Sequence, residues 1–359
     1  MLLFSVTPRS TTWCFFDRVR RMEGEILIPE DAFLSVERRL GGLRDIGPVG
    51  YILYHGGELI TDPVSPVTPD SLLAIQKCSR FLPEYNDALG KVARLGLTLL
   101  PDSPHLLLCD TAFFRDLPEH VHTYAVPLSI KEPSLRRYGG FGLCHEWVWA
   151  EVHRTVPFPP GRIVSVYLGE NTNVAAIRNG RPVETSIGFT PVEGISSARS
   201  CGDIDPTVVF QIQSSGLSFS EIFRLLAEQS GFSGFLGREC TVGAIAGADE
   251  RDPELFRMKD FLAYQIKKYV GAFVAALGGI DAAIFVTEEA DVYAGLIRIL
   301  ACDLGFLPAW IGPSEEFAEG ILRLSAPDSP VPIYSLAYDK WRALGRRVEE
   351  FLKARPSGT

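Results

Sequence analysis

The same succession of short strands and turns occurs twice in this chain, and that repeat constrains the fold more than any other feature. Each copy has three strand-like runs separated by turn residues: 2–6, 12–16 and 25–28 in the first, and 163–168, 173–178 and 181–185 in the second. Asn179-Gly180 joins the last two runs and favours a hairpin, because a type I′ turn needs positive φ at both central residues. Helices and apolar strands follow each copy, the strands lying at 50–54, 105–109 and 282–286. The chain is therefore predicted to be an α/β protein with two similar halves and a cleft between them.

Capping residues mark the starts of several helices. The pairs with cap-then-proline or capping-box spacing are Thr68 before Pro69, Asp205 before Pro206, and Ser218 with Glu221. Further helices are predicted at 260–277 and 341–353. The stretch 229–252 is rich in glycine and small residues, so it is predicted to be loop.

Composition narrows the class of protein. The 359 residues suffice for roughly two domains of about 150 residues, and an apolar fraction of 46% excludes wholesale disorder. Lys and Arg number 35 against 44 Asp and Glu, and the resulting net charge of −9 argues against a nucleic-acid partner. Seven cysteines without a C-x-x-C spacing favour a reduced, cytoplasmic protein. The longest apolar tract, 269–286, is interrupted by Gly278-Gly279 and Asp281, so no membrane span is expected there.

Three stretches of the chain resemble a known family. They read LCDTAFFRDLP at 108–118, RRYGGFGLCH at 136–145, and VETSIGFTPVEGISSARSCGDIDP at 183–206. In this order they resemble the acetate kinase family of acyl-phosphate-forming kinases. The likeness extends over nearly the whole chain and is weakest over 18–45. It implies the duplicated ribonuclease-H-like fold of the sugar kinase, Hsp70 and actin superfamily, with the active site between the two domains.

The resemblance also implies cofactors, partners and domain limits. The family transfers a phosphoryl group reversibly from Mg-ATP to a short-chain carboxylate, so nucleotide and carboxylate are the expected ligands. A homodimer joined through the second domain is expected, although pairing with an active paralogue stays open. The first domain is predicted to comprise 1–112 plus 337–359, and the second 113–336.

Two residues match the catalytic residues of the family. Asp110 corresponds to its active-site Asp and Arg199 to its catalytic Arg, although Cys201 is an extra residue beside the latter. Each has a structural alternative: Asp110 as the N-cap of 111–115, and Arg199 in a salt bridge to a neighbouring Asp. The candidates for binding substrate or phosphate are His55, His145, Gly169, Asn171 and Arg9.

At most other site positions the chain departs from the family pattern. The departures are Thr7 and Pro8 in the first hairpin turn, Ile52 for a substrate-side Arg, Phe141 for the transition-state His, Glu170 in the second hairpin, Glu288-Glu289 for nucleotide-loop glycines, and 332–336, which lacks the metal-binding Glu. Phosphoryl transfer depends on cations, a metal and backbone N–H groups that neutralise the moving phosphoryl group. No metal-ligating residue is therefore assigned, and Mg²⁺ and ATP or ADP are cofactors of the family rather than established ones here.

These departures predict a family member whose kinase activity is very low or lost. Three alternatives stay open: a divergent kinase with relocated cationic donors, a non-catalytic member that binds a metabolite or regulates a partner, and a protein that binds nucleotide without turnover. A reaction at Cys201 is disfavoured, because no His or Asp partner can be assigned to it.

Overall fold

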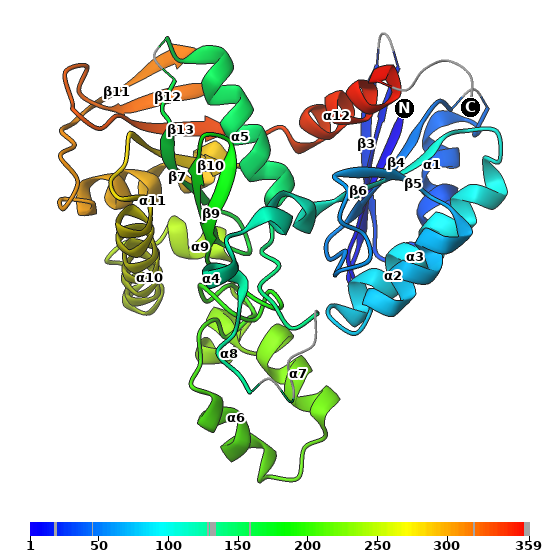
Figure 1. Cartoon of the computed structure of the whole chain (residues 1–359), viewed down its shortest axis with the longest axis horizontal. Coiled ribbons are helices and arrows are strands. Elements are labelled where there is room, and N and C mark those ends of the chain that lie inside the picture. The colour runs from blue at the N-terminus through cyan, green and yellow to red at the C-terminus, as the bar shows by residue number, and fades with distance from the viewer. Residues whose placement is uncertain are drawn as a thin grey trace.

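Two mixed β-sheets, each covered by helices, form the fold (Figure 1). The structure is a computed structural model. It describes residues 1–17, 20–44, 46–127, 129, 134–157, 159–318 and 320–354.

The first sheet has the strand order β3-β2-β1-β4-β6-β5. Its strands are β1 (Leu2–Val6), β2 (Thr11–Phe16), β3 (Arg21–Ile26), β4 (Val49–Leu53), β5 (Val64–Pro66) and β6 (His105–Cys109). The first three strands form an antiparallel meander, β4 and β6 run parallel to β1, and β5 is antiparallel to β6. The predicted strand at 25–28 is displaced, because β3 is an edge strand whose Arg21 and Glu23 face solvent, so an apolar pattern does not mark it.

The second sheet repeats this arrangement and adds one strand. Its order is β9-β8-β7-β10-β13-β12-β11. The strands are β7 (Arg162–Tyr167), β8 (Asn173–Arg178), β9 (Arg181–Thr185), β10 (Ala282–Thr287), β11 (Ile311–Ala318), β12 (Ile321–Ser325) and β13 (Ile333–Ala337). Again a meander is followed by two parallel strands and then an antiparallel one. The shared strand order confirms the prediction of two similar α/β halves, and Asn179 has a φ of +50° in the predicted turn.

Helices cover both faces of each sheet. The α-helices of the described residues are α1 (Ala32–Leu40), α2 (Pro69–Cys78), α3 (Pro83–Leu99), α4 (Glu119–His122), α5 (Gly142–Thr155), α6 (Pro206–Gln213), α7 (Phe219–Glu228), α8 (Gly231–Leu236), α9 (Val242–Ala246), α10 (Pro253–Leu277), α11 (Ala290–Asp303) and α12 (Lys340–Ala354). The large cores lie between α1, α3 and the first sheet, and between α10, α11 and the second. Helix α5 covers the opposite face of the second sheet.

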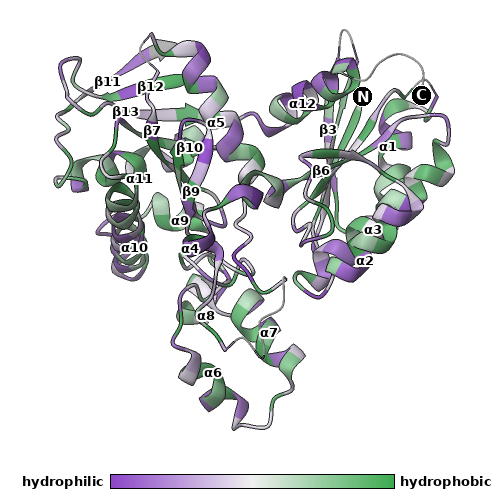
Figure 2. Cartoon of the chain, viewed as in Figure 1, coloured by the Kyte–Doolittle hydropathy of each residue, from purple (hydrophilic) through white to green (hydrophobic). Residues whose placement is uncertain are grey.

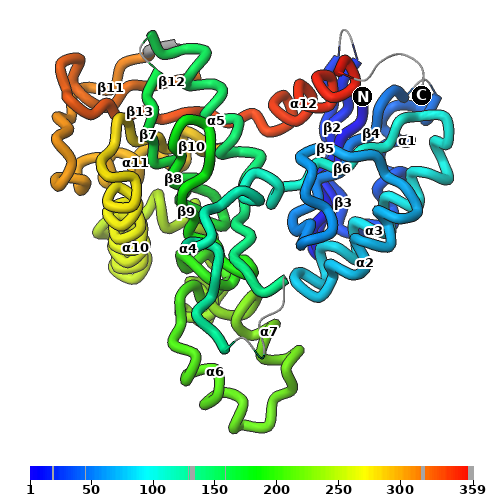
Figure 3. The backbone as a smooth tube through the Cα atoms, viewed as in Figure 1, coloured from blue at the N-terminus to red at the C-terminus, as the bar shows by residue number. Residues whose placement is uncertain are grey.

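The C-terminal helix returns to the N-terminal sheet. Trp341, Leu344 and Val348 of α12 pack with Leu3 and Leu106 of the first sheet. Figure 3 shows this red helix beside the blue strands, although β13, which precedes it in the chain, belongs to the second sheet. Helix α12 therefore completes the core of the first half.

Three helices begin at the capping residues that the sequence predicts. Thr68 and Ser218 form capping boxes and Asp205 accepts a hydrogen bond from the Thr207 N–H.

The prediction of loop over 229–252 is wrong, because α8 and α9 lie there. These helices are too short to be stable alone, and burial of residues such as Phe232 against α10 stabilises them.

A helical extension projects from the second half. Helices α6, α7 and α8 form the lower end of the molecule in Figure 2, and three of their phenylalanines are exposed: Phe210, Phe219 and Phe235. Among the described helices, none combines the length and apolar character needed to cross a membrane.

Candidate functional site

Asp110 lies where the first sheet meets the second half of the molecule. It follows β6 directly, it is 7% exposed, and its carboxylate accepts hydrogen bonds from the backbone N–H groups of Phe141 (2.6 Å) and Leu143 (3.1 Å). The structural alternative, in which Asp110 caps 111–115, is wrong, because its side chain caps the start of α5 instead. Burial raises the pKa of this carboxyl to about 6, and the two N–H groups oppose that rise.

An aromatic stack fills the position next to Asp110. Phe141 precedes α5 with a left-handed φ of +58°, and its ring stacks on Tyr167 at a centroid distance of 4.5 Å. The Tyr167 hydroxyl donates to Glu288 (3.1 Å), and Glu288 forms an ion pair with Lys340 (2.9 Å). Glu288 and Lys340 line a cavity of about 640 Å³ between β2, β3 and the start of α12.

Ile52 is also enclosed in apolar surroundings. It is 6% exposed and belongs to the cluster formed with Leu143 and α12. The position at which the resemblance implies a substrate-side Arg is therefore part of the packing between the first sheet, α5 and α12.

His55 joins the two halves as a neutral imidazole. Its Nε2 donates to the Phe189 carbonyl (3.1 Å) and its Nδ1 accepts from the Gly57 N–H (3.2 Å), while its ring stacks on Phe81. The backbone donor at Nδ1 requires that nitrogen to be unprotonated. Burial lowers the pKa of His55 to about 4.

His145 is fully buried inside the second half. Its ring nitrogens contact the Ser165 hydroxyl (2.9 Å) and Asn173 Oδ1 (2.5 Å), and Asn173 in turn donates to Ser186. Burial lowers the pKa of His145 to about 4 as well. The ring is thus hydrogen-bonded within the second half, and Phe114 lies at its edge.

His55 and His145, the buried histidines with the pKa values of about 4, predict a loss of stability in mild acid. Because each folded-state pKa lies below the ordinary 6.5, the native state excludes a proton that the unfolded chain accepts. The full contribution is present above pH 6.5, and each histidine removes up to about 1.4 kcal/mol per pH unit as the pH falls towards 4. Denaturant unfolding at pH 7 and 5 should show a smaller loss for His145→Gln than for the wild type. The exposed His120→Gln is the control, and an equal loss in all three proteins would contradict the assignment.

Arg199 lies in a cluster of charged groups. It is paired with Glu239, so the structural alternative of a salt bridge to a neighbouring Asp is wrong. Its pKa is lowered first by burial and then by the like charge of Arg9, which lies in the exposed β1–β2 turn. The carboxylates of Glu170 and Glu228 oppose this shift.

The contacts of the second hairpin turn, between β7 and β8, do not favour phosphate binding. Gly169 is buried against the ring of Tyr167, Asn171 is exposed, and Glu170 Oε1 accepts from the Val242 N–H (3.1 Å) at the start of α9. Glu170 thus occupies the N-terminus of a helix, where a negative charge is stabilised.

The carboxylates at this junction do not fit a Mg²⁺ site. Asp110 is committed to the N–H groups that start α5, and Glu288 to Lys340. Within the described ranges, no three His, Cys, Asp or Glu side chains lie close enough together to hold a metal ion. We therefore derive no chemical step through a metal.

Sequence reasoning placed Glu288 at a nucleotide-loop position but missed its contacts with Tyr167 and Lys340. Tyr167 ends β7, Glu288 directly follows β10, and Lys340 begins α12 shortly after β13. The parallel strands β7, β10 and β13 bring their carboxyl ends to one edge. Polar residues directly after parallel strands were the signal that could have identified them.

The architecture defines the class of protein. A meander followed by parallel strands, repeated in two halves, is the duplicated ribonuclease-H-like fold of two-domain phosphotransferases. A crystal structure of acetate kinase from Porphyromonas gingivalis superposes with a TM-score of 0.82 at 25% identity, covering 98% of this chain and 99% of that one. A propionate kinase from Francisella tularensis shares the fold, with a TM-score of 0.82 at 20% identity over 93% of this chain and 95% of that one.

Sequence comparison gives the family. The model of the acetokinase family matches residues 34–303. Acetate kinase from Coprothermobacter proteolyticus is 31% identical over 321 residues, which are 87% of this chain and 79% of that protein. Acetate kinase from Kocuria rhizophila is 33% identical over 317 residues, 86% of this chain and 77% of that protein. The chain belongs to the acetokinase family.

Proposed function

We propose that this member of the family keeps the two-domain scaffold and has very low or no acetate kinase turnover. The observation that carries the proposal is the stack of Phe141 on Tyr167. It lies beside Asp110, at the position where the resemblance implies a transition-state His. A phenyl ring can neither donate a hydrogen bond nor carry charge, so it cannot stabilise a transferring phosphoryl group.

The surroundings of the stack support the same proposal. Ile52 is packed in an apolar cluster, and Asp110 and Glu288 are engaged by protein groups. Removing one electrostatic donor from such a site typically costs about 10² to 10³ in rate. The losses of rate caused by removing several donors from one site are not additive, but the absence of several donors together leaves little turnover.

Direct assay of acyl phosphate formation tests this function. We expect Mg-ATP with acetate, propionate or butyrate to give acyl phosphate at less than about one-thousandth of the rate of Porphyromonas gingivalis acetate kinase assayed in parallel. Turnover comparable to that control, lost in Arg199→Ala, would replace the proposal with a kinase that uses relocated donors.

The like charge of Arg9, which acts on Arg199 electrostatically, favours a second candidate, in which the protein binds a nucleotide or another anion without turnover. A bound anion would offset this repulsion, in competition with Glu239, which already pairs with Arg199. A ligand at about 100 times its Kd raises the free energy of unfolding by about 2.7 kcal/mol. Thermal shifts with Mg-ATP and Mg-ADP that disappear in Arg9→Ala and Arg199→Ala would support this candidate, and no shift in the wild type would reject it.

We also propose domain limits of 1–112 plus 337–359 for the first domain and 113–336 for the second. The packing of α12 on the first sheet supports returning the C-terminal segment to the first domain. Within that segment, 355–359 lie outside the described residues. The seven free cysteines support a location in the reducing cytoplasm.

A homodimer joined through the second half completes the proposal. The exposed phenylalanines of α6, α7 and α8 support it, because exposed apolar side chains in one region commonly mark an interface. Light scattering is expected to give about twice the chain mass of 39.5 kDa.

A further inference from the structure

A cluster of aromatic rings from both halves occupies one part of their junction. Phe81 lies in the connection between α2 and α3 of the first half, and it is only 1% exposed. Its ring packs against Tyr138 and Phe189 of the second half, with a centroid distance of 5.2 Å to each. Connections between helices usually lie at the surface, so the burial of Phe81 depends on the other half of the molecule.

His55 adds a second ring from the first half. It stacks on Phe81 at a centroid distance of 4.6 Å and meets the edge of Tyr138 at 4.7 Å. Its Nε2 donates a hydrogen bond across the junction to the Phe189 carbonyl (3.1 Å), while the Asn86 amide donates to the His55 carbonyl (3.0 Å). The first half therefore presents two stacked rings whose position its own helix α3 supports.

Polar contacts within the second half position the rings that receive them. The Phe189 N–H donates to the Tyr124 hydroxyl (2.8 Å), and this hydroxyl donates to Glu193. Glu193 also forms an ion pair with Arg137 (2.7 Å), the residue before Tyr138. The same carboxylate thus connects the two segments that carry Tyr138 and Phe189, so both rings are held in place within their own half.

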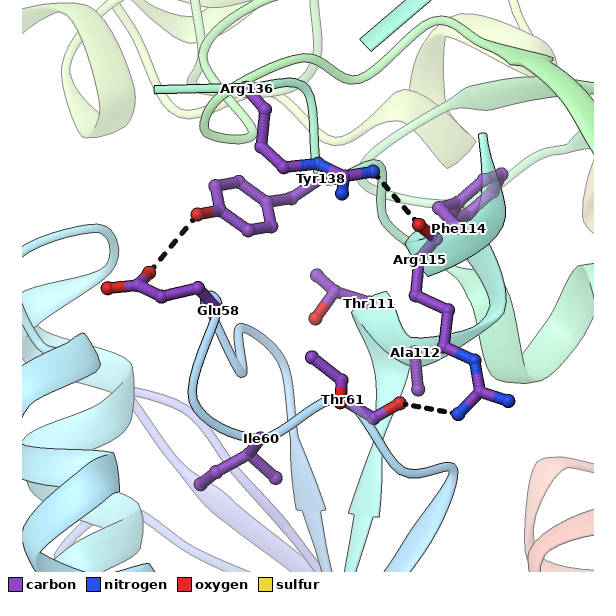
Figure 4. Close-up of a pocket in the computed structure, with 10 residues that line it drawn as sticks. Glu58, Ile60, Thr61, Thr111, Ala112, Phe114, Arg115, Arg136 and Tyr138 are labelled. Carbon is purple, nitrogen blue, oxygen red and sulfur yellow. Dashed lines mark hydrogen bonds between the residues drawn. The ribbon is translucent and has the colours of Figure 1, made fainter. Parts of the chain in front are cut away.

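A polar contact accompanies the rings but is the weaker part of the junction. The Tyr138 hydroxyl lies 3.2 Å from the Glu58 carboxylate of the first half, and Figure 4 shows this contact at the side of a pocket of about 180 Å³. The same hydroxyl lies 2.9 Å from the Ser134 carbonyl, and Glu58 already pairs with Arg80. Because one hydroxyl proton serves two acceptors, the aromatic packing provides most of the contact.

We propose that Phe81, His55, Tyr138 and Phe189 form an aromatic latch, which holds the two halves together without a ligand and must release before they separate. The two rings of the first half lie in segments that follow a strand or a helix, so the latch can release without breaking the core behind the first sheet. The proposal does not depend on kinase turnover, since it concerns only the contact between the halves.

Cys78 makes release of the latch measurable. Its thiol belongs to the same cluster as Phe81 and Tyr138, is 1% exposed, and donates to the Gly56 carbonyl (3.0 Å). Burial raises the pKa of Cys78 to about 11, so the closed latch keeps the thiol protonated and unreactive. A maleimide that carries a polyethylene glycol chain is too bulky to reach Cys78 while the halves are in contact, so it reports their separation.

Labelling of the full chain with this maleimide at pH 7, followed by mass spectrometry of the cysteine peptides, tests the proposal. In the wild type, we expect Cys78 to react at least about 100-fold more slowly than the exposed Cys302. Phe189→Ala changes only the second half and should raise the rate at Cys78 at least about tenfold. Cys14, which is fully buried in the first half, should stay unlabelled and so exclude global unfolding.

Phe306→Ala is the matched control, because it removes the same side chain from a site in the second half that is 48% exposed and outside the latch. It should leave the labelling rate of Cys78 within twofold of the wild type. Tyr124→Phe protects the test against misfolding of Phe189→Ala, since it keeps the ring and removes only the hydroxyl that positions Phe189. This variant should also accelerate the labelling of Cys78.

Two results would overturn the proposal. The first is a wild-type Cys78 that reacts as fast as Cys302, because the halves would then be apart without a ligand. The second is an unchanged rate at Cys78 in both Phe189→Ala and Tyr124→Phe. Equal acceleration at Cys78 and Cys14 would also reject a latch, because it would show that the first half unfolds instead of separating from the second.

Discussion

Replacement of Asp110 by Ala is expected to lower the free energy of unfolding by about 2–4 kcal/mol. The substitution leaves the buried N–H groups of Phe141 and Leu143 without an acceptor, and each such loss typically costs about 1–3 kcal/mol. Denaturant unfolding at pH 7 measures the change. A loss below about 0.5 kcal/mol would show that water replaces the carboxylate and that Asp110 is free to serve another role.

Asp110→Asn separates the hydrogen bonds from the charge. The amide keeps one acceptor oxygen and does not titrate. Since the pKa of about 6 lies above the ordinary value of 3.8, the native state binds the proton more tightly, so this carboxyl stabilises the protein most below pH 3.8 and loses that contribution as the pH rises through 6. The difference between wild type and Asp110→Asn should therefore decline between pH 4 and 6.5, opposite to the effect of the histidines. A flat difference would reject the raised pKa.

The second large effect is expected for Gly142→Ala at the same junction. A Cβ at residue 142 would lie 2.2 Å from the carbonyl oxygen of Asp110 and 2.8 Å from the Phe113 side chain. Backbone cannot yield as a flexible side chain does, so α5 must move away from the end of β6. Overpacking of this kind costs about 1–3 kcal/mol or more, and the shift also stretches the two bonds to Asp110.

Gly295→Ala is the matched control for this substitution. Gly295 lies within α11, where nothing lies within 4 Å of an added Cβ. Alanine should therefore stabilise the helix there by about 0.5–1 kcal/mol. Similar free energies of unfolding for the two variants would show that the contact between α5 and the Asp110 carbonyl is loose.

Local sequence signals predicted the repeated architecture well. Alternation of apolar runs with turn residues located both meanders, and Asn179-Gly180 marked a tight hairpin. The family motifs agreed with the repeat. These features depend on residues near one another in the chain, which is why a single sequence reveals them.

The contacts within the junction depend on residues far apart in the chain. Asp110 caps a helix that begins 32 residues later, and Glu170 accepts from the N–H of Val242. No spacing rule connects such pairs, so the sequence could identify Asp110 as a capping residue but assigned it the wrong helix. Arg199 likewise pairs with Glu239 rather than with Asp203, which is nearer in the sequence.

The return of α12 to the first sheet has a consequence for biosynthesis. A ribosome releases β1 to β6 long before it translates Trp341, so one face of the nascent first sheet lacks its cover while the entire second half is made. That half has all of its own strands by then and folds as a unit. A premature stop codon before residue 340 would therefore leave Leu3 and Leu106 uncovered and prone to aggregation, so the stability of the first half depends on a helix translated after the whole second half.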